Sequence, residues 1–312
     1  MGTLEIRLLG AFRVAWPGRE TSCRLSPRAQ AFFAFLVLHP GRQFRRDVLA
    51  GTFWGASPED KARASLRSTL WRLRRVLEPD GIPPGAYLHT TGASDVSFNN
   101  DSNYELDVRT FERGIEASIE RSDQALTDTL LAQVEGGLDC YSGDLLEGLD
   151  DDWILPERER LRCAYINALA CQMHNLKLRG RYEPALACGR RILAHEPLRE
   201  SVHREMMRLY AQNGGRAEAL RHYTRCAELL RRELAIEPMP ATRALYNEIR
   251  AHQAQESQVP PTAAPEPRST DAESFLATAL DDLANALNHI RSAAARVAQA
   301  DPTAGSIKSP SV

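Results

Sequence analysis

The sequence lacks the patterns of a membrane protein or of a secreted, disulfide-bonded protein. None of its apolar runs approaches the ~20 residues that cross a bilayer. Charged residues interrupt the apolar start of the chain, so we expect no signal peptide. The six cysteines show no C-x-x-C spacing, which indicates reduced thiols and not a disulfide or zinc framework. These absences predict a cytoplasmic protein without a membrane partner.

The signatures of common enzyme chemistry are missing as well. None of the three lysines follows a glycine, so the sequence has no G-x-x-x-x-G-K-[ST] phosphate-binding loop. The eight histidines are scattered, without an H-E-x-x-H motif or a Cys/His cluster at zinc spacing. The aspartates at 150–152 lack the spaced ligands of a calcium loop and are interpreted as the acidic N-terminus of a helix. We therefore predict no catalytic residue, no metal and no cofactor.

The formal net charge of −2 hides a strong division along the chain. Residues 1–100 hold fourteen Lys and Arg against eight Asp and Glu, a net of +6. The remaining 212 residues carry 25 against 33, a net of −8. A basic first part favours a polyanion partner at that end of the protein.

The basic part contains a segment, 61–77, that predicts an amphipathic helix. Its leucines at 66, 70, 73 and 77 follow the i, i+4, i+7, i+11 spacing of one helix face. The opposite face is rich in arginine, which suits guanine edges and phosphates, and a major groove of about 12 Å admits one such helix. The alternative interpretation is a solvated, arginine-rich surface helix.

The stretch before this helix predicts a small antiparallel sheet and two helices. Alternating apolar residues at 4–8 and 12–14 indicate strands, and residues 23–25 indicate a further one. Ser26 and Pro27 are typical of a helix start, and that helix should end at His39. A shorter helix should span 45 to about 53, and the sequence S-P-E-D at 57–60 should cap the basic helix.

Two alternating runs after the basic helix, 86–91 and 95–98, predict a hairpin. Sheet, three helices and hairpin is the order of an OmpR-type winged helix, whose third helix reads the major groove. Residues 4–107 resemble that domain. The matching motifs are L-L-G-A-F-R-V, S-P-R-A-Q, F-W-G and A-R-A-S-L-R-S-T-L-W-R-L-R-R-V-L.

From about residue 104 to 254 the pattern predicts helices throughout. Within it, the segments 178–186 and 212–220 repeat at a period of 34 residues, the spacing of tetratricopeptide repeats. Gly180 and Gly214 should close the first helix of each pair. Ala185 and Ala219 should let the second helix pack closely against the first.

Further motifs in this part resemble the bacterial transcriptional activation domain, an all-helical tetratricopeptide-like module. They are G-D-L-L at 143–146, Trp153, P-E-R at 156–158, H-E-P-L-R-E at 195–200, and the E-L and E-P pairs at 233–238. An OmpR-type head joined to this module resembles the Streptomyces antibiotic regulatory protein family over about residues 4–254. The resemblance implies an α+β winged helix-turn-helix domain followed by an all-α tetratricopeptide-like domain.

We accordingly predict five parts of the chain. They are a winged-helix DNA-binding domain (1–105), a bacterial transcriptional activation domain (106–254), a proline-rich linker (255–270), an amphipathic heptad helix (271–299) and a disordered tail (300–312). The family resemblance does not cover the C-terminal linker and amphipathic helix. The heptad helix either associates with a partner helix or folds back on its own chain.

The resemblance implies a transcriptional activator. Such a protein would bind direct repeats near promoter −35 elements, recruit the RNA polymerase holoenzyme and switch on an antibiotic, that is secondary-metabolite, gene cluster. It would occupy double-stranded promoter DNA as a homodimer of head-to-tail protomers. Trp153, Leu198 and Arg199 are candidate packing residues of the helical module, and we expect Trp153 to lie in the core. The alternative is a helical-repeat scaffold without specific DNA recognition.

The predicted DNA contacts fall into three groups. Phosphate contacts are expected from Arg28, Arg45 and Arg46, near helix starts. Contacts from the basic helix are expected from Lys61, Arg63, Ser65, Arg67, Ser68, Trp71, Arg72 and Arg75. The hairpin, as a wing, should contribute His89, Thr90 and Thr91.

Overall fold

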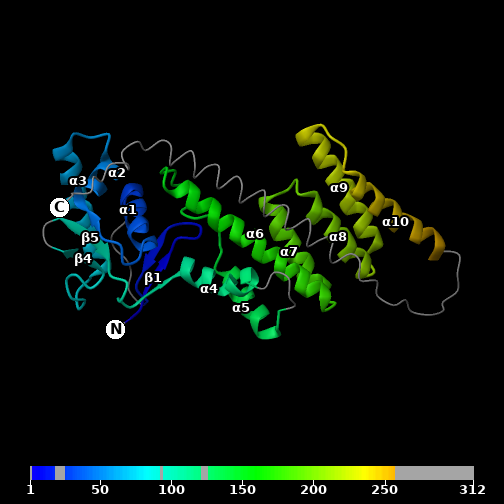
Figure 1. Ribbon diagram of the computed structural model, residues 1–312, viewed down its shortest axis with the longest axis horizontal. Helices are drawn as coiled ribbons and strands as arrows, with labels where there is room; N and C mark the ends of the chain where they lie inside the picture. The colour runs from blue at the N-terminus through cyan, green and yellow to red at the C-terminus, as the bar shows by residue number, and fades with distance from the viewer. Residues whose placement is uncertain (1, 18–24, 92–93, 121–125, 257–312) are drawn as a thin grey trace, which may run out of the picture. The chain divides into compact units, whose positions relative to one another are not determined.

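The computed structural model describes residues 2–17, 25–91, 94–120 and 126–256 (Figure 1). The chain divides into two compact units, Met1–His195 and Glu196–Val312, which are treated separately. Residues 257–312 lie outside the described residues, and with them most of the predicted linker, the heptad helix and the tail. Two of the three residues of the predicted strand at 23–25 also lie outside them. Within the described ranges, no helix combines the length and apolar character needed to cross a membrane.

The first unit opens with a three-stranded sheet of order β2-β1-β6. β1 (Leu4–Arg7) pairs antiparallel with β2 (Arg13–Ala15), as the alternation predicts. β6 (Tyr104–Leu106) pairs parallel with β1, so the prediction of helix from residue 104 onward is wrong at its start. The partner strand lies about a hundred residues away, and local periodicity carries no sign of it.

Three helices and a second sheet follow in the predicted order. The helices are α1 (Pro27–Leu38), α2 (Arg46–Trp54) and α3 (Glu59–Leu77). The sheet has the order β3-β5-β4, formed by β3 (Phe44–Arg45), β4 (Leu88–Thr91) and β5 (Asp95–Phe98). The antiparallel pair β4 and β5 is the predicted hairpin, and the complete head has the element order of a winged helix-turn-helix.

The predicted cap of α3 is wrong in detail. Pro58, and not Ser57, is the N-cap, and no side chain caps this helix end. The backbone N–H of Ser57 instead donates to the Trp54 carbonyl at 2.9 Å, closing the turn after α2. Because Ser57 completes that turn, Pro58 is the residue that precedes the first residue of α3. Its extended backbone suits this position.

After the head, three helices pack together. α4 (Asp107–Glu120) and α5 (Asp128–Asp139) pack against each other, and both contact α6 (Ile154–Leu178) (Figure 1). α4 and α5 cross at two glycines. A Cβ added to Gly114 would lie 2.4 Å from the Cα of Gly137, so neither position accepts a larger residue without moving the helices apart.

The predicted repeat appears as two helix pairs. α6 packs on α7 (Tyr182–His195) in the first unit (Figure 1). In the second unit, α8 (Glu200–Gln212) packs on α9 (Arg216–Leu234), which also contacts α10 (Pro240–Glu256).

The residues that define the repeat take the conformations expected of them. Gly180 and Gly214 have φ of +67° and +80°, the left-handed conformation that ends a helix. Ala185 and Ala219 are completely buried. The boundary between the compact units falls after His195, between the two helix pairs. The domain boundaries predicted from the sequence at 105 and 254 stay a prediction.

Candidate nucleic-acid interface

The leucine seam of α3 is buried as the sequence predicts. Leu66, Leu70, Leu73 and Leu77 are each at most 3% exposed, and the helix packs against α1 and α2. Burial of one face fixes the rotation of the helix about its axis. The arginine-bearing face is therefore the face that α3 presents to solvent.

That exposed face carries most of the predicted recognition residues. Lys61, Arg67, Ser68, Arg72 and Arg75 are exposed, and Ser65 is half-buried. Trp71 is 59% exposed, and the guanidinium carbon of Arg75 lies 5.2 Å from the centre of a Trp71 ring. Across the described residues, Arg67, Arg72 and Arg75 form no ion pair. No carboxylate of the described residues neutralises their positive charge.

Arg63 differs from the other predicted contacts of α3. Its guanidinium pairs with Asp47 of α2 at 3.1 Å and with Glu59, one turn earlier in α3, at 2.6 Å. Two carboxylates thus neutralise the charge of Arg63, and the pair with Asp47 links the N-terminal part of α3 to α2. The Glu59–Arg63 spacing of i, i+4 is visible in the sequence and could have indicated this pairing.

The hairpin is joined to α3 through Arg74. Its Nη2 donates to the Thr90 Oγ1 at 3.1 Å, while its Nε is buried without a partner in the described structure. Thr90 therefore holds the wing to the helix. His89 is exposed, and the backbone of Thr91 pairs with that of Asp95. The tip of the wing, residues 92–93, lies outside the described residues.

Arg45 and Arg46 lie at the start of α2. They line a cleft of about 610 Å³ together with Arg63 and Arg67 of α3. The backbone N–H of Arg46 donates to the Ser94 carbonyl at 2.7 Å, and its Nε is buried without a hydrogen-bond partner among the described residues. Asp47 and Asp60 line the same cleft, so it holds four arginines against two carboxylates and keeps an excess of positive charge that suits an anionic group.

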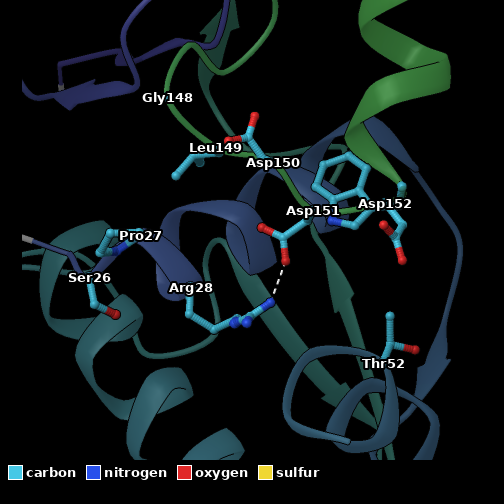
Figure 2. A pocket seen from close by; sticks show the side chains of 10 residues that line it. Ser26, Pro27, Arg28, Thr52, Gly148, Leu149, Asp150, Asp151 and Asp152 are labelled. Carbon is cyan, nitrogen blue, oxygen red and sulfur yellow. Dashed lines mark hydrogen bonds and ion pairs between the residues drawn. The ribbon is translucent and has the colours of Figure 1, made fainter. Parts of the chain in front are cut away.

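Arg28, in the first turn of α1, lies beside the exposed face of α3. With Ser26, Ser65, Ser68 and Arg72 it lines a hollow of about 400 Å³. Its guanidinium also pairs with Asp151, which precedes α6 (Figure 2). The predicted phosphate ligand is thus already bound to a carboxylate in the free protein. The two residues are 123 positions apart, so sequence reasoning could not foresee this pair.

The predicted packing residues of the helical module are only half-buried, so the prediction that Trp153 lies in the core is wrong. Trp153 is the N-cap of α6, and its ring packs edge-on against Phe35 of α1, with 5.3 Å between the ring centres. Its indole Nε1 is buried without a hydrogen-bond partner in the described residues. Leu198 and Arg199 are half-buried in the second unit. Their role between protomers stays a prediction.

The fold and the exposed basic helix define a class of protein, a winged-helix head joined to an all-helical module. Residues 106–250 match the family model of the bacterial transcriptional activator domain. The chain is 29% identical over 250 residues to the regulatory protein AfsR of Streptomyces coelicolor, covering 80% of this chain and 24% of AfsR. It is 25% identical over 257 residues to the transcriptional regulatory protein MoaR1 of Mycobacterium bovis, covering 80% of this chain and 79% of MoaR1.

A solved structure, Mycobacterium tuberculosis EmbR in complex with a low affinity phosphopeptide, has the same general fold. Its TM-score is 0.63 at 22% identity, and the match covers 91% of this chain and 71% of that one. Residues 106–250 therefore match a bacterial transcriptional activator domain, and the chain is similar to these regulators over about four-fifths of its length. It spans about a quarter of the length of AfsR.

Proposed function

We propose that this protein is a sequence-specific DNA-binding transcriptional activator. The observation that carries the proposal is the unneutralised arginine face of α3, held outward by four buried leucines. An exposed helix with free guanidinium groups fits the major groove, where arginine makes bidentate bonds to guanine. The names of the relatives, a regulatory protein and a transcriptional regulatory protein, support the same conclusion.

The contacts divide by what surrounds each residue. Arg67, Arg72 and Arg75 read base edges, with Trp71 supplying apolar contact beside Arg75. Arg45 and Arg46 bind a phosphate at the cleft between α2 and α3 and fix the register of the helix. Arg63 and Thr90 act within the protein, because one is paired with two carboxylates and the other is bound by Arg74.

The family suggests the biological setting. The protein binds direct repeats near promoter −35 elements, as a homodimer of head-to-tail protomers, and recruits the RNA polymerase holoenzyme. Direct repeats require a heterologous contact between protomers, since a two-fold contact would produce an inverted repeat. The regulated genes form a cluster for the biosynthesis of an antibiotic or another secondary metabolite.

The test is selection of duplexes from random sequence by the full chain, followed by a footprint and a salt titration. We expect a footprint over two half-sites in the same orientation, spaced by whole helical turns of about 10–11 bp. Affinity should fall steeply with salt, with a log–log slope near −0.9 for each neutralised phosphate. Failure to enrich any sequence would favour the helical-repeat scaffold and reject this function.

A further inference from the structure

Arg28 lies at the border between two hollows of the first unit. One is the small hollow that it shares with Ser65, Ser68 and Arg72 of the recognition helix. The other, of about 780 Å³, is bounded by α1, Thr52 of α2 and the acidic loop, which we define as residues 148–153 (Figure 2). The Arg28 guanidinium therefore lies near α3 and also near the acidic loop, which precedes α6 of the helical module.

Asp151 is the member of the acidic loop that binds Arg28. Figure 2 shows its carboxylate directed at the guanidinium, while that of Asp150 points away. The Asp151 side chain is 18% exposed, so the pair is partly shielded from water and from salt. The exposed side chain of Arg28 has rotamer freedom to turn toward α3.

The rest of the loop holds Asp151 in this position. The Asp151 carbonyl accepts from the Ile154 N–H at 2.8 Å, at the start of α6. Trp153 packs on Phe35 of α1. Arg158 of α6 donates to the carbonyls of Leu145, Leu146 and Leu149 at 2.8, 3.0 and 2.6 Å, fixing the approach to the loop. The carboxylate is therefore presented to α1 by the fold.

We propose that Asp151 is an internal substitute for a DNA phosphate and lowers the affinity of the head for DNA. Carboxylate and phosphate oxygens make the same charge-assisted bonds to a guanidinium, so Arg28 cannot bind both at full strength. When DNA arrives, Arg28 must leave Asp151, and the uncovered carboxylate then repels the DNA backbone. Movement of the acidic loop away from α1 would release Arg28, which couples the activation module to DNA affinity.

This inference rests on the proposed function, and its test separates the two. A fluorescein-labelled duplex selected by the full-length protein is titrated with protein at several salt concentrations and followed by anisotropy. Asp151→Asn keeps the shape of the side chain and removes its charge. We expect binding about two- to fivefold tighter, the range in which an exposed or half-buried ion pair contributes. Asp152→Asn, the matched control, removes the same charge one position away and should change affinity less than Asp151→Asn does.

A double-mutant cycle with Arg28→Ala identifies the route of the effect. In the Arg28→Ala background, Asp151→Asn should no longer tighten binding. Asp151→Ser serves as a second variant, and a thermal melt verifies that each protein is folded. Unchanged or weaker binding by folded Asp151 variants would overturn the inference, since Asp151 would then position Arg28 or act in folding alone. An equal gain in the Arg28→Ala background would overturn it too. Absence of any selected duplex would instead reject the proposed function.

Discussion

Two helices of this protein, α3 in the head and α9 in the second unit, are almost matched in sequence character. Each has 19 residues, each is rich in arginine, and each buries one face, with four leucines on α3 and Leu230 on α9. Their arginines differ in what surrounds them. On α9, Arg221 pairs with Glu218 at 2.6 Å, Arg231 with Glu237 at 2.9 Å, and Arg232 with Glu233 at 2.8 Å.

On α3 only Arg63 is paired in this way within the described structure. The arginine-rich surface helix that we considered as the alternative for 61–77 therefore exists in this protein, as α9. The two helices show that one amphipathic arginine pattern can carry either paired or unpaired guanidinium groups. Which carboxylates lie beside each guanidinium in the folded structure makes the distinction.

The buried faces of the two helices differ as well. Along α3 the seam is made of leucines with Ala62, Thr69 and Val76, whereas α9 buries His222. His203 of α8 lies against it, with its Nε2 donating to the Pro197 carbonyl at 2.8 Å. The His203 Nδ1 then accepts from the His222 Nε2 at 2.9 Å. Both rings are neutral in this arrangement.

The largest effect should come from the buried leucines, whose truncation should destabilise both helices to a similar degree. Leu73→Ala in α3 and Leu230→Ala in α9 each remove a side chain that is at most 2% exposed. Each should lower the free energy of unfolding by about 2–5 kcal/mol, because a cavity replaces packed methyl groups. Denaturant titration followed by circular dichroism measures this. Leu73→Met, which keeps the volume, should cost less than about 1.5 kcal/mol.

Truncation of exposed arginines should weaken DNA binding when the arginine is on α3 but not when it is on α9. Arg72→Ala and Arg75→Ala should each weaken specific DNA binding by about 1–3 kcal/mol and relax the preference at one base position. Arg221→Ala on α9 removes the same charge from a helix of the same length and should leave DNA affinity unchanged. Gel-shift titrations with the selected duplex compare the three. Equal losses would mean that net charge, and not the face of α3, attracts the DNA.

Acid should destabilise the second unit through its histidine pair. Burial, together with the neighbouring His203 and Arg225, lowers the pKa of His222 to about 4, and burial also lowers the pKa of His203. Glu200 and the Pro197 carbonyl act in the opposite direction on His203. Since the unfolded chain takes up these protons below the ordinary pKa of 6.5, stability is present above that pH.

The free energy of unfolding of α8–α10 should fall by on the order of 1–2 kcal/mol as the pH drops from about 6.5 to about 4. Denaturant titrations at several pH values measure the slope. His222→Gln keeps a donor toward His203 and removes one titrating group, so the slope should become smaller. A slope identical to that of the wild type would assign the acid sensitivity to other groups.

The smallest effect should follow loss of the acidic partners on α9. Glu218→Gln breaks an exposed pair with Arg221 and should change stability by less than about 0.5 kcal/mol. It also leaves an unpaired arginine on α9, as on α3. If such a freed arginine created DNA affinity in the gel shift, the distinction drawn between the two helices would be wrong.

Several features could be predicted because their causes are local. The seam of α3 follows from helical spacing, the hairpin from alternating residues, and the paired helices from two glycines one repeat apart. Three features could not. β6 pairs with a strand about a hundred residues away, Thr90 is bound by Arg74 from another element, and the cap of α3 depends on the turn that ends α2.

By itself, the amino-acid sequence determined which side of α3 is buried, because periodic burial of apolar side chains is a property of the segment itself. Only the tertiary structure decided which arginines remain unneutralised. Arg28 meets Asp151 from 123 residues away and Arg63 meets Asp47 from a different helix, while Arg67, Arg72 and Arg75 meet no carboxylate in the described residues. The electrostatic state of a side chain depends on neighbours in space, and the fold alone chooses them.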